Sequence, residues 1–117
     1  MINELTIKER PFGRGIVFDL QGDLTKQSES VLLGCRDWAA GMGDGQAAVL
    51  NLSSVSIINS AGIALLIRLS QMALKADYRL YAYGVSPHYQ KMFRLIGLTD
   101  YIMIYPDEYS LMQRLES

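Results

Sequence analysis

The chain has 117 residues, of which 50% are hydrophobic and 20% charged, with a formal net charge of −1. This apolar content excludes an intrinsically disordered chain, and the near-zero charge lacks the basic excess typical of nucleic-acid binders. The length fits a single domain over residues 1–117. The charges are unevenly placed, since the run from Gly45 to Ile67 contains none.

The charge-free run is long enough to cross a bilayer, which takes about 20 residues. It also contains four serines, two asparagines and one glutamine, whose polar groups lipid would leave without partners. We therefore predict two buried elements joined by a polar loop, and no insertion into a membrane. The N-terminus has neither a basic start nor an apolar signal core, which favours a cytoplasmic protein. The single Cys35 excludes an internal disulfide and predicts a buried, inert thiol.

Alternating apolar and polar residues predict two strands at the start of the chain, around Leu5–Ile7 and Ile16–Leu20. The turn-rich segment 10–15 joins them, so we expect an antiparallel hairpin at one edge of a sheet. A helix capped by Thr25 or Ser28 follows. Its expected apolar face consists of Val31, Leu32, Cys35, Trp38 and Ala39.

The glycine-rich segment 41–45 is expected to end this helix with a left-handed cap. The almost continuously apolar segment Ala47–Leu52 predicts a strand buried on both faces in the middle of the sheet. After a serine-rich loop over 53–59, a helix is expected from Ser60 to about Lys75. A further strand is expected over Arg79–Tyr83, with alternating burial.

Ser86 and Pro87 predict the N-cap and first turn of a third helix, which ends near Gly97. A last strand over Tyr101–Tyr105 and a helix after Pro106 complete the order β-β-α-β-α-β-α-β-α. The apolar residues of that terminal helix are Leu111, Met112 and Leu115. This order predicts an α/β fold: a mostly parallel mixed sheet of about five strands, an antiparallel N-terminal edge hairpin and four helices.

In such a sheet the functional groups gather on loops beyond the carboxyl ends of the strands, here 21–25, 53–60, 84–86 and 106–107. These loops contain no histidine and no cysteine, and the chain has no GxxxxGK phosphate loop. His88 is expected on a solvated helix face. We therefore predict a protein without catalytic, metal-binding or cofactor-binding residues.

Two carboxylates leave other interpretations open. Asp23 and Asp107 could hold Mg²⁺, as acids do in receiver domains, but that site requires a carboxylate where Asn51 and Ser53 follow the central strand. A small hydrolase or transferase would have to use Asp23 or Asp107 as its base, with no nucleophile pattern beside either.

The segment after the central strand is the most informative one. Asn59 or Ser60 is expected to cap the following helix, and Gly62 would let another surface approach closely. The helix 61–69 carries more apolar surface than one sheet face needs. A neighbouring helix could cover the excess, or it could be an exposed docking surface.

This segment resembles the STAS domain, and in particular the small anti-sigma factor antagonists. Asn59-Ser60-Ala61-Gly62-Ile63 is similar to their Asp-Ser-(Ser/Thr/Ala)-Gly-(Leu/Ile)-Gly stretch, and Gly22-Asp23-Leu24-Thr25 to their Gly-Glu-(Leu/Ile)-Asp turn. Ser86-Pro87, Met92-Phe93 and Gly97-Leu98 match a third helix of the family. The chain departs from the pattern at Asn59, Thr25 and Ala64.

The resemblance implies a phosphorylation-switched binding module of bacterial transcription regulation. Ser60 matches the serine that a partner anti-sigma factor, itself a serine kinase, phosphorylates; a phosphoserine phosphatase would reverse the step. The partner surface would comprise Gly22–Thr25, Asn59–Ile63 and the exposed side of the helix 61–69, with ATP and Mg²⁺ belonging to the kinase. Asn59 leaves a second interpretation open, an unphosphorylated STAS module in a transporter or signalling complex.

Overall fold

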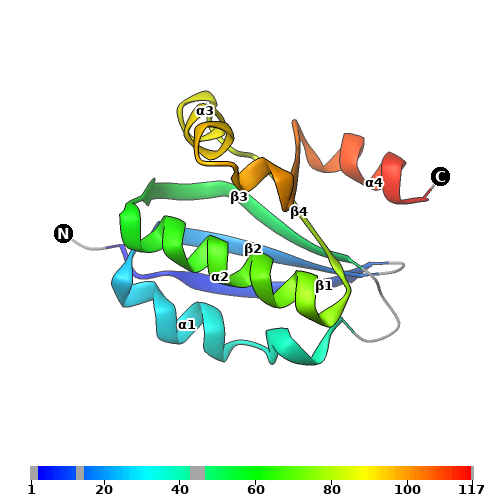
Figure 1. Ribbon diagram of the computed structural model, residues 1–117, viewed down its shortest axis with the longest axis horizontal. Coiled ribbons are helices and arrows are strands. Elements are labelled where there is room, and N and C mark those ends of the chain that lie inside the picture. The colour runs from blue at the N-terminus through cyan, green and yellow to red at the C-terminus, as the bar shows by residue number, and fades with distance from the viewer. Residues whose placement is uncertain (1–2, 13–14, 43–46, 117) are drawn as a thin grey trace.

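The computed structural model describes residues 3–12, 15–42 and 47–116, which form one sheet with helices on both faces (Figure 1). The strands are β1 (Thr6–Phe12), β2 (Gly15–Leu24), β3 (Ala47–Ile58), β4 (Arg79–Tyr83) and β5 (Ile102–Tyr105). The helices are α1 (Glu29–Gly34), α2 (Ser60–Ala76), α3 (Pro87–Leu95) and α4 (Glu108–Glu116). Three 3₁₀ turns complete the order: η1 (Lys26–Ser28), η2 (Trp38–Ala40) and η3 (Leu98–Asp100).

The sheet has the strand order β1-β2-β3-β4-β5. β1 pairs antiparallel with β2 at one edge, and the three remaining pairs are parallel. The predicted fold class, edge hairpin and central position of β3 are therefore confirmed. No helix in the described part of the chain is long and apolar enough to span a membrane.

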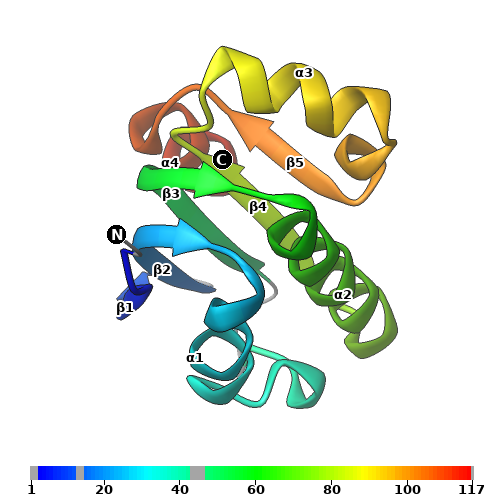
Figure 2. The same cartoon turned by 90° about the vertical axis from the view of Figure 1, so that its left-hand side faces the viewer.

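The core divides into two clusters, one on each face of the sheet. Figure 2 shows α1 and α2 on one side of the sheet and α4 on the other. Leu32 of α1, Leu66 of α2 and Phe93 of α3 belong to the larger cluster. On the other face Leu111 of α4 packs with Tyr81 and other strand residues. The alternating burial expected for β4 is therefore wrong: α4 covers its second face, and all four residues from Leu80 to Tyr83 are buried.

β3 extends through the segment expected to be a serine-rich loop. It runs for 12 residues to Ile58, and its second half pairs with the end of β2 as far as Leu24. The pairing contains two register shifts, between Asp19 and Gln21 and between Gly22 and Leu24. The sequence pattern did not predict this extension, because Ser53, Ser54 and Ser56 are exposed and interrupt the run of apolar residues. The strand leaves the covered part of the sheet there.

The helix expected between a cap at Thr25 or Ser28 and the glycine-rich segment 41–45 is interrupted. α1 ends at Gly34, and Trp38 lies in the separate turn η2. The Trp38 indole N–H donates to the carbonyl of Leu32 over 2.7 Å, and its ring lies 4.6 Å from that of Phe18. The helix ends before Trp38, because the indole ring packs into the core from the separate turn η2.

Two expectations near this turn are also corrected. Cys35 is half-buried rather than buried, although burial raises the pKa of its thiol, in keeping with an inert side chain. Gly41 has a φ of 90° but a ψ of −168°, so it is not a left-handed cap. The other glycines expected to end the helix, Gly43 and Gly45, lie outside the described residues, as do residues 13 and 14 of the hairpin turn.

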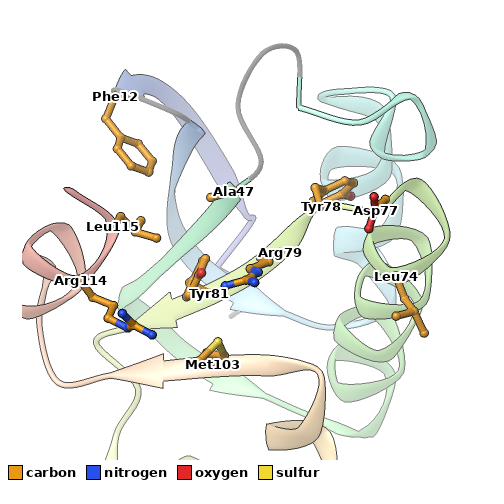
Figure 3. Close-up of a pocket in the computed structure, with 10 residues that line it drawn as sticks. All are labelled: Phe12, Ala47, Leu74, Asp77, Tyr78, Arg79, Tyr81, Met103, Arg114 and Leu115. Atoms are coloured by element: carbon orange, nitrogen blue, oxygen red, sulfur yellow. The ribbon is translucent and has the colours of Figure 1, made fainter. Parts of the chain in front are cut away.

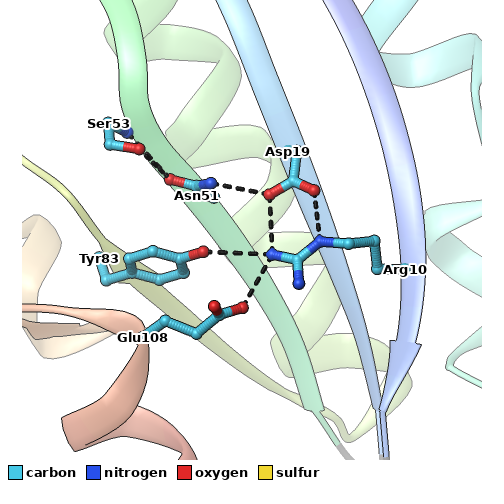
Figure 4. Close-up of polar contacts among 6 residues, drawn as sticks. All are labelled: Arg10, Asp19, Asn51, Ser53, Tyr83 and Glu108. Carbon is cyan, nitrogen blue, oxygen red and sulfur yellow. Dashed lines mark hydrogen bonds and ion pairs between the residues drawn. The ribbon is translucent and has the colours of Figure 1, made fainter.

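A polar cluster fastens α4 to the sheet (Figure 4). Arg10 of β1 donates to Asp19 of β2, to Glu108 of α4 over 2.8 Å and to the Tyr83 hydroxyl over 3.3 Å. Asn51 of β3 donates to Asp19 over 2.7 Å. The hydrogen bonds from Arg10 hold the pKa of Asp19 below its usual value, while burial raises the pKa of Tyr83 to about 12 and keeps its hydroxyl protonated.

We expect Asp19→Asn to lower the free energy of unfolding by about 1 kcal/mol at neutral pH, because half-exposed Arg10 loses one of its two charged partners and keeps only Glu108. Since the pKa of Asp19 is lower in the folded chain, its contribution exists above about pH 4 and is lost as the pH falls further. Urea unfolding at pH 7 and pH 3 should therefore show a gap between wild type and variant that narrows in acid. Asp100→Asn, outside the cluster, is the control; a gap that does not change with pH contradicts this role.

Candidate partner-binding site

The end of β2 and the start of α2 are joined by backbone contacts. Leu24 pairs with Ile58 at the end of β3, and the Asn59 N–H donates to the Leu24 carbonyl over 3.2 Å. The Tyr89 hydroxyl of α3 accepts a hydrogen bond from the Ile58 N–H over 3.0 Å. The turn 22–25 and the segment 59–63, far apart in sequence, therefore form one surface region.

Gly62 allows α2 to reach this position. A Cβ atom there would lie 2.1 Å from the Leu24 carbonyl oxygen, a distance that no side chain can occupy. The close approach expected at Gly62 is therefore confirmed, but the approaching surface is the chain's own β2. Gly22, with a φ of 116°, makes a similar contact to the backbone of Glu4.

Asn59 caps α2, so the hydroxyl of Ser60 is not needed as the cap. The Asn59 side-chain oxygen accepts a hydrogen bond from the Gly62 N–H over 3.0 Å. Ser60 is the first residue of the helix and is exposed, and its hydroxyl makes no hydrogen bond to the described residues. The N–H groups of Ser60 and Ala61 belong to the first turn of α2. Among the described residues they have no hydrogen-bond acceptor.

The nine residues expected to bind a partner differ in accessibility. Asn59 and Ser60 are exposed, and Thr25, Ala61 and Ile63 are partly exposed. Gly22, Asp23, Leu24 and Gly62 are buried, so they shape the site through their backbones. In the expected docking helix, Ala64 and Ile67 are exposed, whereas Leu65, Leu66 and Leu69 belong to the core.

The burial of Asp23 was not predicted from the sequence. Its side chain is only 5% exposed; one carboxylate oxygen accepts from the Asn3 N–H over 3.4 Å, and the other has no partner among the described residues. Ser28 donates to the Asp23 carbonyl and accepts from the Thr25 N–H, which fixes the turn. An alternating strand pattern gives no signal for this inward rotation, because it arises at the register shift between Gly22 and Leu24.

The other chemical candidates have structural partners or lie on the surface. Asp107 accepts from the Ser110 N–H at the start of α4, which lowers the pKa of its carboxyl group, and His88 is exposed on α3. Asn51 and Ser53, which stand where a receiver domain needs an acid, hydrogen-bond to each other. No group of three or more metal-ligating side chains occurs within the described ranges.

A family model described as "Mlab, STAS domain" matches residues 11–105. The chain belongs to the STAS domain family. No curated protein sequence matches it significantly.

Solved structures share this STAS fold. SpoIIAA, the cell fate determinant of Bacillus, is similar in its phosphorylated form, with 20% identity, a TM-score of 0.71, and coverage of 94% of this chain and 99% of that one. The anti-sigma factor antagonist SpoIIAA in its unphosphorylated form has 16% identity, a TM-score of 0.72, and coverage of 96% and 99%. An anti-sigma factor antagonist from Mycobacterium paratuberculosis has 16% identity, a TM-score of 0.70, and coverage of 97% and 96%. At these identities the likeness shows the fold.

We expect the two residues at the helix start to differ in their effect on stability. Asn59→Ala should lower the free energy of unfolding by about 1 kcal/mol, because the Gly62 N–H loses its acceptor. Ser60→Ala should change it by less than about 0.5 kcal/mol, because the hydroxyl holds nothing in place. Thermal and urea unfolding of both variants measure this difference, and equal losses would show that Ser60 shares the capping.

We expect Gly62→Ala to lower the free energy of unfolding by at least about 2 kcal/mol, because the added methyl group meets backbone that cannot move independently. Gly34→Ala is the matched control: no atom lies within 4 Å of its added Cβ. That change should be neutral or stabilise by up to about 1 kcal/mol. Similar losses for the two variants would contradict the contact between α2 and β2.

Proposed function

We propose that this STAS domain, acting as one unit over residues 1–117, is an anti-sigma factor antagonist of the cytoplasm. It sequesters an anti-sigma factor with serine kinase activity while Ser60 is unphosphorylated, and releases it when Ser60 is phosphorylated. The kinase supplies ATP and Mg²⁺, a phosphoserine phosphatase restores the binding state, and this chain catalyses no reaction.

One observation carries the proposal: Ser60 is exposed at the start of α2 while Asn59 supplies the cap. A serine needed for capping would lose that bond on modification. Here a kinase can reach the hydroxyl without opening the fold, and the fold keeps its cap after phosphate transfer. The match of the family model and the fold shared with anti-sigma factor antagonists support the same function.

The position of Ser60 also accounts for a switch that does not unfold the chain. A phosphate group adds about −1.5 to −2 charges. At a helix N-terminus it meets the free N–H groups of Ser60 and Ala61 and the positive end of the helix dipole, so the domain itself tolerates it. An apolar or acidic partner surface would not, and an unpaired charge in such an interface costs about 3–5 kcal/mol.

The surface for this partner consists of the accessible members of the site. Thr25, Asn59, Ser60 and Ile63 surround the start of α2, and Ala64 and Ile67 extend the surface along the helix. The buried members, above all Leu24 and Gly62, keep the two segments at a fixed distance. The partner would therefore bind a preformed surface whose only change on switching is the charge at Ser60.

A STAS module that is not phosphorylated is the second candidate, as an accessory subunit of a transporter or signalling complex. Asn59 favours it, because the acid that precedes the phosphorylated serine in anti-sigma factor antagonists is missing. The description of the matching family model names a STAS domain and no anti-sigma factor, so it fits this candidate as well. The same surface would then hold a partner permanently.

We expect Ser60→Ala to bind the cognate kinase like the wild type and to remain bound in the presence of ATP. Ser60→Asp should bind at least about 100-fold more weakly, since 1.4 kcal/mol corresponds to a factor of ten. Isothermal titration calorimetry gives the affinities, and mass spectrometry after incubation with kinase and ATP locates the phosphate. Ser30→Asp, on an exposed position of α1, is the charge-matched control.

The outcomes separate the two candidates. Phosphate on Ser60 together with weak binding of Ser60→Asp supports the antagonist. Binding of all three proteins with equal affinity, and no phosphate on Ser60, contradicts the switch and favours the permanent module.

A further inference from the structure

An open hollow of about 630 Å³ lies on the α4 face of the sheet, at the amino ends of β3 and β4 (Figure 3). Tyr81 of β4 forms its floor together with Arg79, which precedes it by two residues and therefore lies on the same face of the strand. The register places Met103 of β5 beside Tyr81 and Ala47 of β3 beside Arg79. We call this space the β4 hollow. Its volume lies in the range of about 300–1,000 Å³ that is usual for ligand pockets.

Apolar side chains surround the floor of the β4 hollow. Leu74, from the end of α2, is 69% exposed, and Met103 is 44% exposed. Leu115 of α4 and Phe12 of β1 lie on the side away from α2 and are partly exposed (Figure 3). A ligand with an apolar body would remove this surface from water, which favours binding.

The Tyr81 hydroxyl lacks the partner that a buried tyrosine normally has. The residue is 4% exposed and its ring lies 6.1 Å from that of Tyr105, but its hydroxyl forms no hydrogen bond within the described residues. Tyr83, two residues further along the same face, has its hydroxyl bonded to Arg10 over 3.3 Å. Buried tyrosine hydroxyls usually find a partner, so one that lines a hollow without a partner points to a ligand.

Arg79 brings a positive charge to the same floor. Its side chain is exposed and takes part in none of the ion pairs between described residues. A guanidinium group presents several N–H donors in one plane and binds carboxylate or phosphate oxygens in pairs. Arg79 and Tyr81 lie about 7 Å apart along the strand, at about 3.3 Å per residue. One anionic group between their side chains can therefore accept hydrogen bonds from both.

The other charged residues of the lining lie at opposite ends of the hollow. Arg114 lies on α4, and Asp77 lies just after α2 (Figure 3). Arg79 and Tyr81 lie between them. The lining thus contains two cationic side chains and one carboxylate. Asp77 would repel an anion at the α2 end, so the anionic group is expected over Arg79 and Tyr81, toward α4.

We propose that the β4 hollow binds a small organic anion. Arg79 and the Tyr81 hydroxyl hold its carboxylate or phosphate group, and its aromatic or aliphatic body lies against Leu74 and Met103. This division into a few placed polar groups and an apolar lining is typical of small-molecule sites.

The β4 hollow is separate from the candidate site around Ser60. It lies at the amino end of β3, whereas Ser60 follows the carboxyl end of that strand. The 12 residues of β3 rise about 36 Å, at about 3.3 Å per residue. This distance exceeds the Debye length of about 8 Å at physiological salt, so a charge on Ser60 has little effect on an anion in the hollow.

The test uses two fluorescent probes with the same aromatic body. Anilinonaphthalene sulfonate is an anion, whose sulfonate takes the place of the carboxylate or phosphate group, and phenylnaphthylamine is neutral. Each probe is titrated into the full chain, and the rise in fluorescence gives its dissociation constant. Phenyl phosphate and inorganic phosphate then compete with the anionic probe.

The variants separate the two polar groups of the hollow. Arg79→Gln changes an exposed side chain, and Tyr81→Phe keeps the ring and removes a hydroxyl that bonds to no described residue, so both should fold normally. Asp77→Asn removes the carboxylate at a position with a φ of 63°, which asparagine tolerates. Arg94→Gln, exposed on α3, is the matched control for the loss of an arginine.

We expect saturable binding of the anionic probe, which phenyl phosphate displaces at concentrations at least about tenfold lower than inorganic phosphate. Arg79→Gln should weaken binding of this probe at least about tenfold and Tyr81→Phe at least about threefold, with changes below about twofold for the neutral probe. Arg94→Gln and Ser60→Asp should bind like the wild type. Asp77→Asn should bind the anionic probe equally or more tightly, because a repelling charge is lost.

Three results would overturn the proposal: no saturable binding of the anionic probe, equal losses of both probes in Arg79→Gln, or the same loss in Arg94→Gln. A loss in Asp77→Asn as large as that in Arg79→Gln would overturn it as well. A failure of the Ser60 switch leaves these titrations unchanged, so the two proposals fail separately.

Discussion

The contact between Gly62 and the Leu24 carbonyl is the constraint on which the site depends. It places the first turn of α2 directly on the end of β2, at a distance that excludes any side chain at position 62. The hydrogen bond from Asn59 to Leu24 and the pairing of Leu24 with Ile58 hold the same junction from two further directions. Because the junction is backbone against backbone, none of these contacts involves the side chain of the exposed Ser60.

The two faces of the sheet have different tasks. The face under α1, α2 and α3 contains the larger core cluster and supports the junction. The opposite face is held by α4, through Leu111 and through the charged cluster of Arg10, Asp19 and Glu108. This cluster joins the edge hairpin to the C-terminal helix, so it ties together the two ends of the chain.

The candidate site combines a rigid support with surface chemistry that is free to change. Asp23, Leu24 and Gly62 are buried and fix the backbone, while Asn59 takes up the capping bond. Ser60 neither fixes the backbone nor caps the helix. In the proposed switch, a charge added at this position would change the surface and leave the buried support in place.

The sequence by itself determined the order of elements, the fold class, the central strand and the start of α2, because local periodicity and capping residues such as Asn59 and Ser86 reflect local physics. It also singled out Ser60 and Gly62. Only the tertiary structure decided that β3 continues to Ile58, that the first helix stops before Trp38, and that Asp23 turns inward. These features depend on strand register and on the packing of one large ring against another element. The charge-free run from Gly45 to Ile67 contains the segment Asn59–Ile63 of the candidate site, whereas long-range contacts decided which of the candidate residues are exposed.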